Sequence, residues 1–278
     1  MLERKGLYLC NLPSDLSEAT IIYPDSSMIR FLRRFDPHPI RLLVFDLDGT
    51  LIDSRLDLIH SVNAMLRHFE RPELAGDVIA SYVGDGAPVL VRRALGNGTA
   101  GNGAANIGTG DGVDEALFCS ALEYFLGYYR LHKLDHTTVY DGIPEVLAGL
   151  AAGSVRAGAD KSVRPTRVMA VLSNKPVRPS QDIVQALGLG EYFVRVYGGN
   201  SFATKKPDPL GVRTLLEETG VAADEALMIG DSSIDVLTGR NAGLWTCGVT
   251  YGFAPHTLEE VAPDVVVDGP RELGELLG

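Results

Sequence analysis

Residues 41–51 read RLLVFDLDGTL, and this stretch decides the fold. A short apolar run ends at Asp46, and Asp48, Gly49 and Thr50 follow at once. Such a run, stopped by polar and glycine residues, predicts a buried parallel strand that ends in a loop. Side chains two positions apart along a strand point to the same side, so the two carboxylates initially face the same way. They repel each other unless a cation lies between them.

The carboxyl end of a parallel strand is where α/β proteins bind their ligands. The pair Asp46 and Asp48 therefore predicts a Mg²⁺ site in which one carboxylate is free to act as a nucleophile. Gly49 lets the backbone approach an anion closely, and Thr50 offers amide and hydroxyl donors to it. For a single DxDG motif, a plain turn at the end of a strand is the alternative.

Similar apolar runs recur along the rest of the chain, at 168–172, 194–197, 226–229, 244–249 and 265–267. Helix-length stretches lie between them, at 179–187, 209–219 and 233–242. Alternating strands and helices predict an α/β fold, namely a doubly wound, Rossmann-like parallel sheet with helices on both faces.

Residues 54–136 break this alternation, because their apolar residues recur at helical spacing. They predict a helical cap domain inserted after the first core strand. The core domain then comprises residues 41–53 and 137–278. Residues 1–40 show no clear period and are predicted to be a loosely attached extension.

Two low-complexity stretches interrupt this plan, at 96–112, which is rich in Gly and Asn, and at 151–166. Neither has enough apolar surface to offset the entropy of ordering it, so both are predicted to be surface loops. The first of them lies in the predicted cap.

The composition excludes several classes of protein. The 278 residues include 25 Lys and Arg against 36 Asp and Glu, a net charge of −11, which is the wrong sign for binding nucleic acid through its phosphates. No apolar run is long enough to span a membrane and no signal peptide is recognisable. The three cysteines are widely separated, without zinc or disulfide spacing. We expect a cytoplasmic protein, monomeric or homodimeric.

Polar residues suited to phosphate chemistry follow the other predicted strands. Ser173 and Asn174 follow the second run and are suited to holding a phosphate oxygen. Lys206 precedes two prolines that fix the backbone, so its ammonium can be aimed. Asp231 follows the fourth run and could complete the metal site, whereas Asp235, one turn later, could cap its helix.

These groups occur in one order at the ends of successive strands, and in this the sequence resembles the haloacid dehalogenase superfamily. The superfamily's four motifs match residues 46–51, Ser173, Lys206 and residues 230–235. Over about residues 41–278, the chain is most similar to the phosphoglycolate phosphatase group. It departs from the pattern in its N-terminus, in both low-complexity stretches, and in Ser173, where many relatives have threonine.

The resemblance implies hydrolysis of a small phosphorylated metabolite through a phosphoaspartyl intermediate on Asp46. It implies that Mg²⁺ is held by the Asp46 and Asp231 side chains and the Asp48 backbone carbonyl. The Asp48 side chain would be the general acid and base, and Ser173 and Lys206 would neutralise the phosphoryl oxygens. Asp235 would orient Lys206 or the metal loop.

Within the predicted cap, residues 82–87, YVGDGA, resemble the family's substrate-facing loop through Gly84, Asp85 and Gly86. Arg93, or its neighbour Arg92, could reach a substrate carboxylate, although two arginines on a solvated helix face are the alternative. We therefore expect 2-phosphoglycolate as the substrate.

Alternatives within and beyond the superfamily stay open. Asp48 disfavours dehalogenases and phosphonate-cleaving enzymes, which lack an acid at this position, but a β-phosphoglucomutase-like transferase or a pyrophosphatase would keep it. A non-enzymatic regulatory module is disfavoured by the complete motif set. The histidines show no ligand spacing together with acids, and we expect them to be surface or packing residues; they include His60, His68, His132 and His136.

Overall fold

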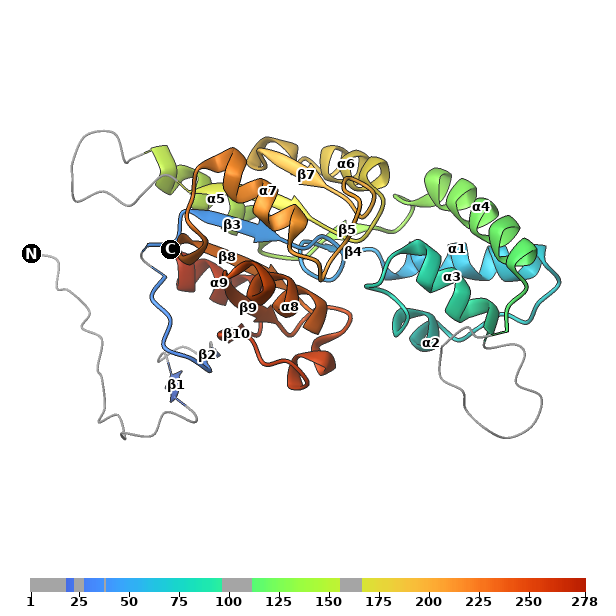
Figure 1. Cartoon of the computed structure of the whole chain (residues 1–278), viewed down its shortest axis with the longest axis horizontal. Coiled ribbons are helices and arrows are strands. Elements are labelled where there is room, and N and C mark those ends of the chain that lie inside the picture. The colour runs from blue at the N-terminus through green and yellow to red at the C-terminus, as the bar shows by residue number, and fades with distance from the viewer. Residues whose placement is uncertain (1–18, 23–27, 38, 97–111, 156–166) are drawn as a thin grey trace, which may run out of the picture.

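The structure is a computed structural model that describes residues 19–22, 28–37, 39–96, 112–155 and 167–278 (Figure 1). Within these residues the central sheet has eight strands, in the order β1-β2-β10-β9-β8-β3-β6-β7. Their bounds are β1 (Ala19–Ile22), β2 (Met28–Phe31), β3 (Leu42–Phe45), β6 (Val168–Leu172), β7 (Arg195–Tyr197), β8 (Ala226–Gly230), β9 (Trp245–Val249) and β10 (Val265–Val267). Strands β3 and β6 to β10 are parallel.

Strand β3 lies at the centre of the parallel part. Phe45, its last residue, pairs in register with Val171 of β6 on one side and Ile229 of β8 on the other. From β3 the chain continues to β6 and β7, and then returns across the sheet to β8. The boundary between β3 and β8 is thus a topological switch point, where α/β proteins bind ligands. The predicted doubly wound parallel sheet is confirmed.

The sheet is buried on both faces. Leu43 and Phe45 point into one core and Leu42 and Val44 into the other, as the two-residue period of a strand requires. This double burial explains why the strand is continuously apolar instead of alternating. The covering helices are α5 (Ile143–Val155), α6 (Val177–Ala186) and α9 (Pro270–Leu277) on the first face, and α7 (Leu210–Thr219) and α8 (Ser233–Ala242) on the second.

A helical segment projects from the carboxyl edge of the sheet (Figure 1). Its helices are α1 (Arg55–His68), α2 (Gly76–Ala80), α3 (Ala87–Gly96) and α4 (Glu115–His132). They enclose a core of their own, in which Met65, Leu90 and Phe125 are buried. The short strands β4 (Ile52–Asp53) and β5 (Thr138–Val139) pair antiparallel where the chain leaves the sheet and returns.

The prediction of a loosely attached N-terminal extension is wrong for its described part. Strand β2 pairs antiparallel with β10, and Ile29 is fully buried. The Arg30 guanidinium donates two hydrogen bonds, of 2.6 and 2.8 Å, to the Asp268 carboxylate. A strand of four residues is too short to show a clear two-residue period of apolar side chains. Its partner β10 lies more than 200 residues away in the sequence, so no local pattern predicts the pairing.

The structure tests the two predicted surface loops to different extents. Residues 97–111 lie outside the described residues, so the prediction for 96–112 stands untested beyond its ends. The predicted loop at 151–166 begins too early, because α5 continues through Val155. Leucine and alanine in this part of the chain favour a helix.

Among the described residues, no helix has the length and apolar character needed to cross a membrane.

Candidate active site

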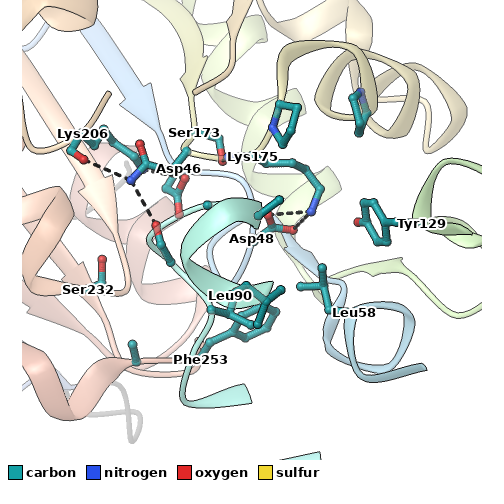
Figure 2. Close-up of a pocket in the computed structure, with 18 of the residues that line it drawn as sticks. Asp46, Asp48, Leu58, Leu90, Tyr129, Ser173, Lys175, Lys206, Ser232 and Phe253 are labelled. Atoms are coloured by element: carbon teal, nitrogen blue, oxygen red, sulfur yellow. Dashed lines mark hydrogen bonds and ion pairs between the residues drawn. The ribbon is translucent and has the colours of Figure 1, made fainter. Parts of the chain in front are cut away.

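A cavity of about 60 Å³ lies between the carboxyl edge of the sheet and the helical segment (Figure 2). Charged and polar residues of the sheet loops line one side: Asp46, Asp48, Ser173, Asn174, Lys175, Lys206 and Asp231. Mostly apolar residues of the helical segment line the other, among them Leu58, Val83, Leu90, Phe125 and Tyr129. Polar groups of the sheet loops thus face a mostly apolar surface of the helical segment across the cavity.

Asp46 directly follows β3 and is 8% exposed. Its Oδ1 accepts a hydrogen bond of 2.7 Å from the Lys206 ammonium, which also donates to Asp235 Oδ1 at 2.6 Å. Burial alone would lower the pKa of Lys206, but the Asp235 and Asp46 carboxylates raise it above its usual value. The lysine therefore stays charged, and Asp235 helps to hold it against Asp46.

Asp235 has a second contact that settles what the sequence left open. Its Oδ2 accepts from the backbone N–H and the hydroxyl of Ser232, and the Ser232 side chain in turn caps α8, which makes a capping box. Asp235 thus both caps its helix and orients Lys206.

Asp231 follows β8 and is held by the turn at residues 250–254. Its Oδ2 accepts hydrogen bonds from the backbone N–H groups of Phe253 and Ala254, at 2.5 and 3.1 Å. Gly49, with φ of 83°, lies against the same carboxylate, since a Cβ at this position would meet Asp231 Oδ2 at 2.3 Å. The close backbone approach predicted for Gly49 is therefore toward Asp231, and Gly49 is not among the residues lining the cavity.

The donor set fits a hard divalent cation. Carboxylate oxygens of Asp46, Asp231 and Asp235 lie within 4.8 Å of one another. Burial raises the pKa of Asp46 to about 6 and that of Asp231 to about 8, and the neighbouring carboxylates add to both shifts. When all four aspartates of the site are ionised, their negative charges exceed the positive charges of Lys175 and Lys206 by two. A divalent cation would offset this excess. The four are Asp46, Asp48, Asp231 and Asp235. Oxygen ligands without His or Cys favour Mg²⁺ over zinc.

These pKa shifts predict that the metal-free protein loses stability as the pH rises from about 5 to about 8.5. A carboxyl whose pKa is raised by folding stabilises the fold below its unfolded pKa of about 3.9, and this contribution is lost as the pH rises through 6 and 8. We expect the melting temperature in EDTA to fall by at least about 4 °C over this range.

Asp231→Asn is the matched control for this pH profile, because asparagine keeps the shape of the side chain and removes its titration. Its melting temperature should depend less on pH than that of the wild type, and saturating Mg²⁺ should flatten the wild-type profile. Identical profiles for the variant and the wild type in EDTA would contradict the assignment.

The Asp48 side chain does not join the other carboxylates. It forms an ion pair with Lys175, whose Nζ lies 2.8 and 3.0 Å from its two oxygens (Figure 2). It also accepts a hydrogen bond from Ser54. The predicted convergence of the Asp46, Asp48 and Asp231 side chains is therefore wrong in this respect. The sequence contained one signal for Lys175, which directly follows Ser173 and Asn174 at the end of β6.

Ser173 and Asn174 have different surroundings. Ser173 Oγ accepts from the backbone N–H of Lys175, which leaves its own hydroxyl proton for a ligand in the cavity. The Asn174 amide instead donates to the carbonyls of Gly84 and Lys206, both at 3.1 Å. Because its donor is taken up by these carbonyls, the Asn174 side chain cannot hold a phosphate oxygen here, contrary to the prediction.

The cap loop predicted to face the substrate is only partly in the cavity. Gly84 and Gly86 line it, whereas Asp85 forms an ion pair of 2.7 Å with Arg93 and is not a lining residue. Arg92 pairs with Glu115 and stacks on Phe118. Asp85 and Arg93 therefore satisfy each other outside the cavity lining, and their predicted substrate contact stays a prediction.

One further prediction needs correction. Thr50 is fully buried and lies outside the cavity lining, so its predicted donors do not face a ligand. His60 and His136 are exposed, as expected of surface residues, and in the fold both lie near Asp57. Asp57 accepts hydrogen bonds from the backbone N–H groups of His136 and Thr137, so it fastens the returning chain to α1.

Known proteins identify the class to which this fold and site belong. The family model described as "Haloacid dehalogenase-like hydrolase" matches residues 43–249. The match spans most of the chain, and the protein belongs to this hydrolase family.

Similar individual proteins narrow the class. A phosphoglycolate phosphatase of Rhodospirillum rubrum is 34% identical over 238 residues, which cover 86% of this chain and 91% of that protein. One from Pseudomonas syringae pv. tomato is 36% identical over 84% of this chain and 78% of its own length. The crystal structure of a predicted phosphoglycolate phosphatase from Haemophilus somnus superposes with a TM-score of 0.75 at 27% identity, covering 86% of this chain and 99% of that one. The chain is a phosphatase enzyme.

Proposed function

We propose that the protein hydrolyses 2-phosphoglycolate to glycolate and phosphate, with Mg²⁺ and through a phosphoaspartyl intermediate. The observation that carries the mechanism is the position of Asp46. It directly follows the central strand at the switch point, lines the cavity, and has one oxygen hydrogen-bonded to Lys206. Among the described residues, its other oxygen has no hydrogen-bond donor.

In the first step, an Asp46 oxygen attacks phosphorus and the bond from phosphorus to the leaving oxygen breaks. Lys206 and the Ser173 hydroxyl donate to the phosphoryl oxygens as negative charge spreads over them. In the second step water attacks phosphorus, the bond to Asp46 breaks, and phosphate leaves.

Asp48 moves the protons. In its neutral acid form it gives a proton to the leaving alkoxide in the first step. The resulting carboxylate takes a proton from the attacking water in the second step, which restores the acid, a contribution of about 10²–10⁴-fold. Its side chain lies in the cavity and is held by Lys175 and Ser54.

The Asp46 and Asp231 side chains and the Asp48 backbone carbonyl would hold Mg²⁺. When bound, Mg²⁺ neutralises phosphoryl charge and lowers the repulsion between nucleophile and substrate. Asp231 is prepared for this role because two backbone N–H groups fix one of its oxygens.

One observation supports phosphoglycolate as the substrate. The relatives at 34 and 36% identity are phosphoglycolate phosphatases. In this proposal residues 54–136 are the cap that excludes water from the reaction.

A panel of phosphate compounds tests the proposal, with 2-phosphoglycolate, β-glucose 1-phosphate and pyrophosphate assayed with and without Mg²⁺. We expect the highest kcat/KM for phosphoglycolate, and only with Mg²⁺. Comparable efficiency on β-glucose 1-phosphate, with glucose 6-phosphate as the product, would establish a mutase instead. Preferential cleavage of pyrophosphate would establish a pyrophosphatase.

A further inference from the structure

A buried tyrosine hydroxyl lines the cavity and finds no acceptor among the residues that the structure describes. Tyr129, on α4, is 3% exposed and lines the cavity. Among the described residues, its hydroxyl proton has no acceptor, because the one neighbour with which the hydroxyl interacts, the Lys175 ammonium, can only donate. Figure 2 shows this hydroxyl pointing toward Lys175 and Asp48. A buried donor without a partner costs free energy, so its position indicates that a ligand supplies the acceptor.

A buried ammonium lies beside this hydroxyl. The Lys175 side chain is 4% exposed, and its Nζ lies 4.7 Å from the centre of the Tyr129 ring. Its Nζ donates to both oxygens of one carboxylate, Asp48. An ammonium has three N–H donors, so Lys175 can bind a second anion while it holds Asp48.

The other cations near the cavity are already engaged. Lys206 lies between Asp46 and Asp235, where the mechanism needs it. Arg93 pairs with Asp85, and Arg92 pairs with Glu115. Of the described cationic side chains that line the cavity, Lys175 is therefore the one that can serve a group other than the phosphate.

We infer that Lys175 and Tyr129 form the subsite for the substrate's carboxylate. The inference rests on the proposed function and assigns its specificity to these two residues. The Lys175 ammonium and the Tyr129 hydroxyl, one from the sheet loops and one from the helical segment, donate to the same carboxylate. The substrate thus bridges the two parts of the protein.

The position of Asp48 sets how far the carboxylate lies from the ester. The leaving oxygen must contact Asp48 to receive its proton. Lys175 Nζ lies only 2.8 Å from Asp48, so a carboxylate one carbon beyond the ester oxygen reaches Lys175, given carbon–carbon bonds of about 1.5 Å. The incoming carboxylate shares the ammonium with Asp48, which leaves Asp48 free to turn to the leaving oxygen.

The test compares 2-phosphoglycolate with ethyl phosphate, which has a methyl group in place of the carboxylate. The readout is the ratio of their kcat/KM values. We expect Tyr129→Phe, which removes only the hydroxyl, to lower this ratio by about tenfold or more, as loss of a hydrogen bond to a charged group does. Lys175→Met should lower it by about a hundredfold, and Lys175→Arg should recover part of the loss.

Tyr128→Phe is the matched control, because it removes a hydroxyl from the same helix at a residue that does not line the cavity. Its ratio should equal that of the wild type. If Lys175→Met does not fold, as judged by circular dichroism and melting temperature, Tyr129→Phe decides the question alone.

Several results would overturn the inference while leaving the phosphatase activity standing. An equal loss on both substrates in Tyr129→Phe and Lys175→Met would mean that these residues act through Asp48 or through packing. Loss of the preference in Arg93→Met would assign the carboxylate to the cap arginine. A wild type that hydrolyses both esters equally well has no carboxylate subsite. If the wild type hydrolysed neither ester, the proposed function itself would fail.

Discussion

Replacing Asp46 with asparagine should lower kcat by at least about 10³-fold on every substrate, because the covalent nucleophile is removed. Asparagine has nearly the same shape, and Lys206 keeps Asp235 as a partner, so the variant should fold. Its circular dichroism spectrum should match that of the wild type. Phosphate release under single-turnover conditions measures the effect.

The neighbouring aspartate gives a different result in the same assay. Asp48→Asn keeps the nucleophile but cannot take a proton from water, so acid-quenched samples should retain phosphate on the protein. Asp141→Asn, at an exposed aspartate, is the control and should behave as the wild type does. Near-normal turnover by Asp46→Asn would refute the nucleophile assignment.

Removing divalent cations should abolish activity, and Mg²⁺ should restore it. Without a cation, the carboxylates Asp46, Asp231 and Asp235 face one another in a buried site, and burial raises the pKa of Asp231 to about 8. A phosphate dianion would add further negative charge beside Asp46. Activity after exhaustive EDTA treatment and after titration with Mg²⁺ measures the effect.

Stability provides a second measurement that does not depend on turnover. A cation that binds the folded site and not the unfolded chain stabilises the fold, so we expect Mg²⁺ to raise the melting temperature in a concentration-dependent way. Asp231→Asn should weaken this response. Activity that survives EDTA, or full restoration by Zn²⁺ alone, would contradict a site of hard oxygen ligands.

Local patterns in the sequence were sufficient to predict which polar residues lie together in the candidate site. Asp46, Ser173, Lys206 and Asp231 each follow a recognisable apolar run, and in a parallel sheet the carboxyl ends of the strands meet at one edge. Their proximity therefore follows from the fold class. The same reasoning failed for β2, whose pairing with β10 joins distant parts of the chain.

The partners of individual side chains could not be predicted in this way. Asp48 forms an ion pair with Lys175, which is 127 residues away along the chain. Asn174 donates a hydrogen bond to a carbonyl of the cap loop. The rule that side chains two positions apart point the same way holds only within a strand. Asp48 lies beyond the end of β3, so the rule did not fix the direction of its side chain. Such choices depend on which donors and acceptors approach from other elements.

The sequence by itself determined the parallel strands of the sheet, the order of the candidate site residues along its edge and the charge of the site. Only the tertiary structure decided that Arg93 forms an ion pair within the cap segment. It also decided that Asp235 both caps α8 and holds Lys206, and that Tyr129 faces Lys175. The physical reason is that strand ends are placed by local apolar runs and by hydrogen bonding between strands. A buried charge is instead paired by whichever group the packing of separate elements brings within about 3 Å.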